Sequence, residues 1–492
     1  MNRASGVLLH PTSLPSKFGS GTFGKCAYDF IDLLEKSNQK IWQMLPLGPT
    51  DTTASPYQSY SAFAGNSILI DLDMLCEDGL LEKNDLVNEN LFNNEEFEYK
   101  VAFDFSLQKL KKAFENFAID ENAKKFYKKN NFWLDDYSFF MALNDHFGNI
   151  YFVDWPKKIK NRDELTMKGY KIQLKDNIDF HKFVQFKFFE QYFKLKAYAN
   201  SKNIQIIGDI PIYVSANSAD VWANKELFEL NANMKPKNVA GVPPDYFSQT
   251  GQRWGNPIYK WKNHKLTNYA WWISRMKFNL ELFDIVRIDH FRGFEAFWSI
   301  PAKEETAING KWVKGPDHEL FQAFENKFGK NLPIIAEDLG LITAEVEKLR
   351  DDFGLPGMKI LQFAFGGGSQ NGYLPHNFVN NCVVYTGTHD NDTTAGWINE
   401  LTQNNHWALN HLKQYLNEEK IENLNFGIIS ECLKSVAKFA IIPIQDILEL
   451  DTKSRMNIPG TVNGNWRYKM SHDDFESENF VKLKNLCEIY GR

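Results

Sequence analysis

The sequence of 492 residues lacks the features of several protein classes. No apolar stretch is long enough to cross a membrane, and the apolar run in MNRASGVLLHPTSLPS is too short for a signal peptide. The five cysteines are scattered and form no CxxC pair, which argues against a disulfide framework or a zinc site. A net charge of −6 provides no basic footprint for nucleic acid or membrane. We therefore expect a soluble, cytoplasmic protein that binds neither.

Aromatic residues, in contrast, are abundant. They make up 15% of the chain and include 13 Trp and 19 Tyr. Much of the phenylalanine is expected in the core. Tryptophan and tyrosine are more informative, because a flat face with a polar edge suits the binding of sugars and nucleobases.

Eight short apolar runs, rich in β-branched residues, recur along the chain. They span residues 6–10, 41–48, 204–214, 284–293, 332–340, 358–365, 382–390 and 440–447. Continuous apolar runs are typical of parallel strands that are covered on both faces, and helical patterns lie between most of them. This alternation favours an α/β fold, a (β/α)₈ TIM barrel, over a doubly wound sheet. The segment GGGSQNGYLPHNFVNN, after the sixth run, shows no helical pattern and predicts a loop.

Two connections are too long to be simple loops. Residues 66–200, after the second strand, have helical periodicity and predict a mostly helical subdomain. Residues 215–265, after the third strand, are irregular and aromatic, and predict a substrate-binding loop or subdomain. Without repeats or linkers, the chain is expected to form a single catalytic barrel over residues 1–492, with both insertions around its C-terminal mouth.

Acidic residues follow four of the predicted strands, where the active site of a barrel lies. They are Asp209, Asp289, Glu337 with Asp338, and Asp390 with Asp392. Because residues i and i+2 of a strand share a face, Arg287 should lie beside Asp289 and lower its pKa by about 1–3 units. Crowding and partial burial should raise the pKa of Glu337 and keep it protonated. An ionised carboxylate facing a protonated acid is what cleavage of a glycosidic bond requires.

Other interpretations of these acids stay open. A single Asp at a strand end can be a helix N-cap or a solvated ion-pair partner, although four such ends together speak against this. Carboxylates on neighbouring strands can also hold Mg²⁺. Because Arg287 and His389 lie among the acids, where a cation would compete with the arginine, we expect no metal and no cofactor. Treatment with a chelator would distinguish the two cases.

Six motifs are specific enough to compare with known families. They are ASPYQ (54–58), GDIPIYV (208–214), GVPPDYFSQTGQRWGNPIY (241–259), RIDHFRG (287–293), AEDLG (336–340) and GTHDNDT (387–393). With them, the chain resembles, over essentially its whole length, the 4-α-glucanotransferases of the amylomaltase or disproportionating enzyme family, within the α-amylase clan. The resemblance implies that Asp289 is the nucleophile, with Arg287 as its partner, and that Glu337 is the general acid/base.

The resemblance also implies roles for the sugar-binding residues. Asp390 would stabilise the transition state by gripping sugar hydroxyls, together with His389. Tyr57, with Ser55 nearby, would pack against the glucose ring that is cleaved, and Asp209 would bond to the same sugar. Such enzymes retain the anomeric configuration through a covalent intermediate, so the carboxyls of the nucleophile and the acid should lie roughly 5–5.5 Å apart.

The segment 241–259 has the composition of a substrate-binding loop. Its glycines and prolines shape an irregular path. It offers stacking faces and hydroxyl partners in Tyr246, Phe247, Trp254, Tyr259, Gln252 and Asn256. Packing beneath an Ω-loop is the alternative, but the polar neighbours favour a substrate role. In the resembled family this loop is a lid on the acceptor side, which would hold the acceptor and exclude water.

The expected activity is transfer of α-1,4-glucan segments from a donor to an acceptor glucan or glucose, in maltose or glycogen metabolism. Asn465 resembles the end of the family pattern and is expected to bind substrate, whereas Arg253 and the histidines at 10, 264 and 290 receive no role. The alternatives are an α-glucan hydrolase with the same carboxylates, a metal-dependent barrel enzyme and an inactive glucan-binding protein. Expected partners are maltooligosaccharides, α-1,4-glucans and glucose, bound by a monomer or homodimer.

Overall fold

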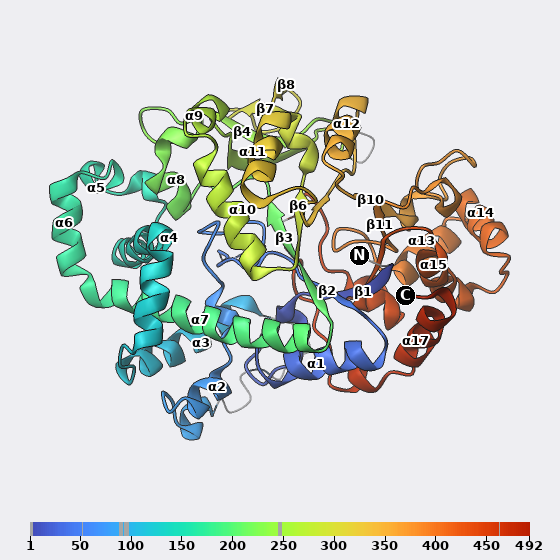
Figure 1. Cartoon of the computed structure of the whole chain (residues 1–492), viewed down its shortest axis with the longest axis horizontal. Helices are drawn as coiled ribbons and strands as arrows, with labels where there is room; N and C mark the ends of the chain where they lie inside the picture. The colour runs from blue at the N-terminus through green and yellow to red at the C-terminus, as the bar shows by residue number, and fades with distance from the viewer. Residues whose placement is uncertain (1–2, 52, 88–91, 93–97, 245–247, 462) are drawn as a thin grey trace.

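The computed structural model describes residues 3–51, 53–87, 92, 98–244, 248–461 and 463–492. Eight parallel strands form a sheet at the centre of the molecule (Figure 1). Their order in the sheet is β10-β11-β12-β1-β2-β3-β6-β9. In chain order these strands are β1 (Ala4–Leu8), β2 (Ile41–Gln43), β3 (Gln205–Pro211), β6 (Ile285–Asp289), β9 (Ile334–Ala336), β10 (Gly357–Ile360), β11 (Cys382–Tyr385) and β12 (Phe439–Pro443).

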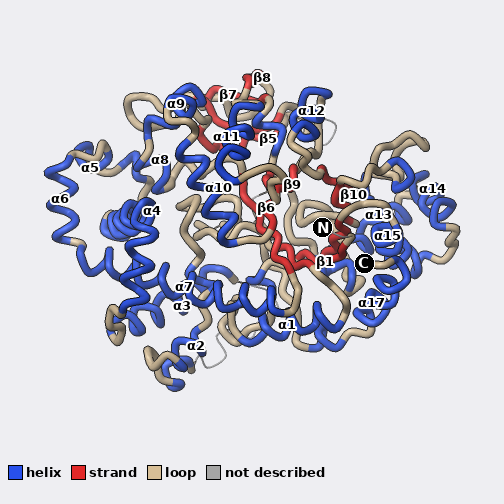
Figure 2. Tube along the Cα trace, viewed as in Figure 1, coloured by secondary structure: helices blue, strands red, loops and turns tan. Residues whose placement is uncertain are grey.

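The sheet almost closes on itself. Its two outer strands, β9 and β10, meet where the N–H of Ala336 donates to the carbonyl oxygen of Pro356 at 2.9 Å. Figure 2 shows the strands as a central group with helices around it. The predicted TIM barrel is confirmed, and each of the eight predicted strand regions overlaps one of these strands.

The strands are apolar throughout because both of their faces are covered. In β11, Val383 and Tyr385 belong to the cluster inside the barrel, whereas Cys382 and Val384 belong to the layer beneath the helices. Strand β6 follows the same alternation, with Ile285 inside the barrel and Val286 in the outer layer. Residues 287 and 289 of β6 therefore share the inner face, as the spacing predicts.

Helices lie between most of these strands, as predicted, and others follow the last strand. They are α1 (Lys25–Lys36), α10 (Ala270–Leu282), α11 (His318–Phe328), α12 (Ala344–Asp352), α13 (Thr394–Gln403), α14 (Trp407–Leu416), α15 (Leu424–Lys434), α16 (Ile444–Ile447) and α17 (Asn479–Tyr490). Residues 361–381, all of which the structure describes, contain only 3₁₀ turns, as predicted for the segment after the sixth strand.

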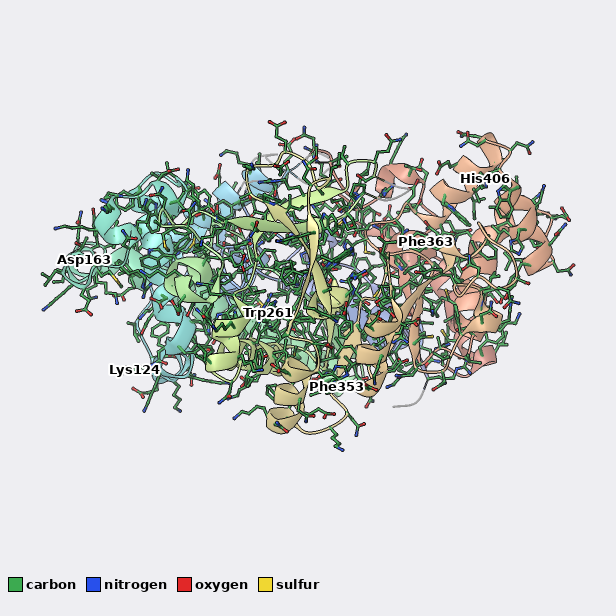
Figure 3. All side chains as sticks on the ribbon, turned by 90° about the horizontal axis from the view of Figure 1, so that it is seen from above. Lys124, Asp163, Trp261, Phe353, Phe363 and His406 are labelled. Carbon is green, nitrogen blue, oxygen red and sulfur yellow. The ribbon has the colours of Figure 1, made fainter. Side chains whose placement is uncertain are left out.

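The connection from β2 to β3 is helical. It contains α2 (Leu72–Glu77), α3 (Tyr99–Glu115), α4 (Glu121–His146), α5 (Lys157–Lys160), α6 (Glu164–Gln173) and α7 (Lys175–Ser201). Helices α4 and α7 pack through aromatic rings, such as Trp133 and Phe189, whose centroids lie 5.9 Å apart. Viewed from above, this region, with Lys124 and Asp163, forms one end of the molecule, and the helix that follows His406 forms the other (Figure 3).

A second sheet was not predicted. Its four antiparallel strands have the order β5-β4-β7-β8. They are β4 (Asn238–Val242), β5 (Gln252–Pro257), β7 (Ala296–Pro301) and β8 (Lys311–Lys314), and short helices α8 (Ala219–Ala223) and α9 (Trp261–Leu266) flank the first two. The expectation of irregular structure over 215–265 was therefore wrong for β4 and β5. Their local pattern is weak, and β4 is held by β7, which lies beyond β6 in the sequence.

Candidate active site

Arg287 joins two of the predicted site carboxylates. Its Nη1 lies 2.6 Å from Oδ2 of Asp209, and its Nη2 lies 3.0 Å from Oδ1 of Asp289. The parallel register of β3 and β6 places Asp209 opposite Arg287, and the i, i+2 spacing brings Asp289 to the same side. The arginine side chain is 5% exposed, whereas that of Asp289 is 29% exposed. The nucleophile candidate is thus partly exposed, while its ion-pair partner is buried.

The predicted direction of the Asp289 pKa needs correction. Burial raises the pKa of Asp289 well above its ordinary value, Arg287 opposes this rise, and Glu337 and Asp209 add to it. One guanidinium must serve two carboxylates, and its shorter contact is to Asp209. Arg287 therefore limits the cost of ionising Asp289 without bringing its pKa below the usual range.

Glu337 follows β9 and is held by backbone. Its Oε2 accepts a hydrogen bond of 2.6 Å from the N–H of His290, and its Oε1 accepts one of 3.0 Å from the N–H of Leu339. Burial raises the pKa of Glu337 to about 7, against the lowering effect of Arg287 and the two N–H groups. The direction agrees with the prediction, and a substantial protonated fraction is present at neutral pH.

One peptide unit connects the two acids, because His290 directly follows Asp289 and donates to Glu337. His290 adopts a left-handed conformation, with φ 55° and ψ 49°. Asp289 and Glu337 therefore lie in one group of interacting carboxylates. The carboxyl separation of roughly 5–5.5 Å stays a prediction.

Asp390 lies on the loop between β11 and α13. Its Oδ1 accepts a hydrogen bond of 2.6 Å from Nδ2 of Asn457 and lies 3.4 Å from Nε2 of His389. Nη2 of Arg455 donates to its carbonyl oxygen at 2.6 Å. The carboxylate is 47% exposed and open to a ligand. Asn457 and Arg455 were missed by sequence reasoning, although Asn457 lies inside and Arg455 directly before MNIPGTVNGNWR (456–467), the segment at which the family resemblance ends.

Tyr57 connects this loop to the arginine. Its ring stacks on the His389 imidazole, with centroids 5.3 Å apart and planes 19° apart, and Trp466 lies 6.0 Å away. Its hydroxyl donates to Oδ2 of Asp209 at 2.7 Å. Burial lowers the pKa of His389, so this imidazole is neutral at pH 7. Ser55, two residues before Tyr57, is half-buried.

The second sheet brings part of the predicted lid to the site. The Trp254 ring meets the His290 ring edge-on at 4.8 Å, and its Nε1 donates to Oε1 of Gln252 at 3.1 Å. Asn256 is buried and donates to the carbonyl oxygen of Val214. Tyr246 and Phe247 lie outside the described residues.

Two further residues of the sequence analysis now have visible partners. Asn465 is buried, accepts from the N–H of Ile458 and donates to the carbonyl oxygen of Thr461, so its amide connects these two residues. Its contact with substrate stays a prediction. Arg253 is exposed, as expected, and donates to the carbonyl oxygen of Ala302.

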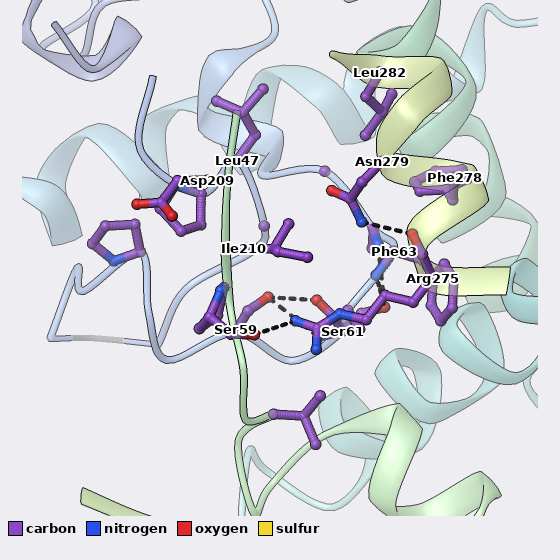
Figure 4. Close-up of a pocket in the computed structure, with 18 of the residues that line it drawn as sticks. Leu47, Ser59, Ser61, Phe63, Asp209, Ile210, Arg275, Phe278, Asn279 and Leu282 are labelled. Atoms are coloured by element: carbon purple, nitrogen blue, oxygen red, sulfur yellow. Dashed lines mark hydrogen bonds between the residues drawn. The ribbon is translucent and has the colours of Figure 1, made fainter. Parts of the chain in front are cut away.

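A small pocket, open to solvent, adjoins the site at Tyr57 and Asp209. In Figure 4, Asp209 and Ile210 lie on one of its sides, and Arg275, Asn279 and Leu282 approach it from helix α10. The catalytic pair does not line this pocket.

Two searches of the described residues bear on the alternatives. No group of three or more His, Cys, Asp or Glu side chains among them is arranged to hold a metal ion. Within the same residues, none of the helices combines the length and apolar character needed to cross a membrane.

Comparison with known proteins identifies the family. The sequence pattern described as 4-alpha-glucanotransferase matches residues 9–474. The chain belongs to this family. A 4-alpha-glucanotransferase from Clostridium butyricum is 49% identical over 98% of this chain and 100% of its own, and one from Synechocystis is 47% identical over 100% and 98%. The amylomaltase from Streptococcus agalactiae, solved in complex with acarbose, superposes with a TM-score of 0.96 at 41% identity, over 100% and 99% of the two chains.

Family membership confirms the resemblance predicted from the six motifs, including the enzyme class. The roles of individual site residues stay predictions, and the proposal below builds on their geometry.

Proposed function

We propose that the protein is a 4-α-glucanotransferase that moves α-1,4-glucan segments from a donor to an acceptor glucan or glucose by a retaining double displacement. The observation that carries this proposal is the arrangement of the two acids: Asp289 forms an ion pair with Arg287, and the N–H of the next residue, His290, binds Glu337. It stands at the strand ends of a barrel in a chain of the 4-α-glucanotransferase family. The enzyme would act in the cytoplasm on maltooligosaccharides, as a monomer or homodimer.

In the first step, Glu337 protonates the glycosidic oxygen while a carboxylate oxygen of Asp289 attacks C1 of the sugar. The C1–O bond to the leaving chain breaks, and that chain departs with a free 4-hydroxyl. An ester between the donor glucan and Asp289 results. Arg287 favours the ionised nucleophile at the start, and the pKa of Glu337, about 7, leaves a proton available.

In the second step, the ionised Glu337 accepts the proton of the acceptor's 4-hydroxyl as that oxygen attacks C1. The ester bond breaks, Asp289 leaves as a carboxylate, and Glu337 is protonated again. Two inversions at C1 give net retention. No group outside the chain and its two glucans is consumed.

Sugar hydroxyls have partners around this pair. The exposed carboxylate of Asp390 and the neutral imidazole of His389 can hold hydroxyls of the ring at which the charge develops. Tyr57 presents the ring that stacks on His389, and Asp209 is held between Tyr57 and Arg287. Held in this way, the sugar presents C1 to Asp289.

Transfer exceeds hydrolysis when an acceptor sugar occupies the position that water would otherwise take. Trp254 supports this role, because it lies against His290, the residue that connects the two acids. A glucose ring stacked on this indole would place its hydroxyl near Glu337.

Incubation with maltotriose alone tests the function. Transfer conserves the number of glycosidic bonds, so glucose and a ladder of longer oligosaccharides should form while the number of reducing ends stays constant. A rise in reducing ends with only shorter products would instead indicate an α-glucan hydrolase. Asp289→Asn and Glu337→Gln should abolish turnover and still bind maltooligosaccharides. Full turnover in both variants would contradict the assigned site, and retained activity in EDTA would separate it from a metal-dependent enzyme.

A further inference from the structure

Asp446 lies at the foot of the loop that carries His389 and Asp390. It belongs to the short helix α16, directly after β12, and is 1% exposed. Its Oδ2 accepts hydrogen bonds from the hydroxyls of Thr386 and Thr394, the latter at 2.8 Å. Its Oδ1 accepts a bond of 2.7 Å from the backbone N–H of Thr394. One carboxylate thus binds both ends of the loop, since Thr386 directly follows β11 and Thr394 begins α13.

The loop between these ends is itself closely bonded. Oδ1 of Asn391 accepts from both the N–H and the hydroxyl of Thr388, at 2.9 Å each. Nε2 of Gln362 donates to the carbonyl oxygen of Asp392 at 2.8 Å. Asn457 and Arg455 bond to Asp390 from outside the loop, so the remaining freedom of the loop lies mainly at its two ends. Asp446 is the group that binds both of these ends.

Burial of an acidic side chain that accepts only from neutral donors is costly for stability. Burial raises the pKa of Asp446 to about 6, against the lowering effect of its three hydrogen bonds, and the nearby Asp392 adds to the rise. The amide oxygen of an asparagine could accept the N–H of Thr394 at lower cost. The placement therefore suggests a role other than stability.

We propose that Asp446 is a positioning residue, which sets the place of Asp390 by binding Thr386 and Thr394 at the two ends of its loop. This inference rests on the proposed role of Asp390 in holding the sugar. Asp446 touches no substrate in this scheme. A shift of the loop by a fraction of an ångström would displace the carboxylate from the hydroxyls it binds, and misplacement of about 1 Å can lower a rate by about a hundredfold.

The test removes one hydroxyl from one end of the loop. Thr386→Val keeps the side-chain shape and removes its bond to Asp446. Thr22 and Asp71, near the N-terminus, provide a matched control. Both are buried, the Thr22 hydroxyl donates to Oδ2 of Asp71 at 2.6 Å, and Asp71 is the N-cap of α2. Thr22→Val removes the same type of bond without touching the Asp390 loop. The two variants should lose similar thermal stability.

Rates are measured with α-maltosyl fluoride as donor and maltose as acceptor, because departure of fluoride needs little help from the general acid. We expect Thr386→Val to lower kcat by about tenfold to a hundredfold with KM for maltose changed less than about threefold. Thr22→Val should leave kcat within about twofold of the wild type. Thr394→Val, which keeps the backbone bond to Asp446, should have an intermediate effect and serves as the second variant if Thr386→Val folds poorly.

The decisive measurement is a double-mutant cycle with Asp390→Asn. If Asp446 acts through Asp390, Thr386→Val should lower kcat by less than about threefold in the Asp390→Asn background. An equal loss in both backgrounds, or a comparable loss in Thr22→Val, would overturn the positioning role. If Asp390→Asn lowers kcat and Thr386→Val does not, this inference alone fails. If Asp390→Asn itself retains full kcat, the proposed role of Asp390 fails first and this inference fails with it.

Discussion

The backbone N–H of His290 lies 2.6 Å from Oε2 of Glu337. The peptide that follows the nucleophile therefore holds the acid, through a residue in the left-handed conformation. Such an N–H favours the ionised carboxylate, whereas burial favours the protonated one, and the pKa of Glu337 rises to about 7 as the net result. The same residue can then give a proton in one step and accept one in the next.

The activity should consequently fall at alkaline pH. The first step needs protonated Glu337, so kcat/KM for maltotriose should decrease above pH of about 7, approaching tenfold per pH unit. Initial rates of glucose release between pH 5 and pH 9 measure this. Because the two acids interact, the apparent pKa belongs to the pair. A profile that stays flat to pH 9 would contradict the assignment.

Glu337→Gln should stabilise the protein at high pH while abolishing transfer. The folded pKa of about 7 exceeds the ordinary value of 4.5, so the native state binds more protons between these values and stability decreases as pH rises through this window. Removing the charge should raise the free energy of unfolding by on the order of 1–2 kcal/mol at pH 8 and by much less at pH 5. Thermal unfolding at both pH values checks this. An equal gain in Tm at pH 5 and pH 8 would count against burial of the charge as the cause.

Arg287→Lys should lower kcat/KM by about a hundredfold, since an ammonium group cannot reach two carboxylates as the guanidinium fork does. The acid limb of the pH profile should move upward, because the pKa of Asp289 loses its main lowering influence. Arg253→Lys, on an exposed arginine, is the matched control and should behave as the wild type. Retained activity in Arg287→Lys would show that charge alone suffices.

Tyr57→Phe separates the stacking of Tyr57 from its hydrogen bond. The variant keeps the ring on His389 but loses the bond to Asp209, and kcat/KM should fall by about tenfold. Tyr57→Ala removes both the ring and the hydrogen bond, and should lower kcat/KM by about a hundredfold or more. Steady-state rates with maltotriose compare the two. Equal losses would indicate that the hydroxyl carries the whole effect.

Arg492→Ala should destabilise the barrel without affecting kcat. Its guanidinium donates to the carbonyl oxygens of Ala4, Leu433 and Ala437, among others, and so joins the first strand to the segment before the last. Leaving these buried carbonyls without donors should cost about 2–4 kcal/mol. Urea unfolding measures the loss, and Lys484→Ala, on the exposed face of α17, should change stability by less than about 0.5 kcal/mol. A loss below 1 kcal/mol in Arg492→Ala would mean that water replaces the arginine.

Local pattern determined much of this protein. Continuous apolar runs between helical patterns predicted the eight strands, and the two-residue period of a strand placed Arg287 and Asp289 on one face. Both patterns involve only residues that are close together in the sequence. The acids at the strand ends and the six motifs predicted the family, which the comparisons confirm. Neither the strands nor the family required knowledge of any long-range contact.

The tertiary structure alone decided the contacts between residues distant in the chain. Pairing of β4 with β7 makes a sheet that neither segment predicts by itself. Burial of Asp289, with Glu337 and Asp209 close by, outweighs the influence of Arg287 and reverses the expected direction of the Asp289 pKa. Asn457 reaches Asp390 from 67 residues away, and Asp446 binds the loop from 52 and 60 away. Sequence periodicity reports which face a side chain takes, but partner, distance and burial depend on how the whole barrel closes.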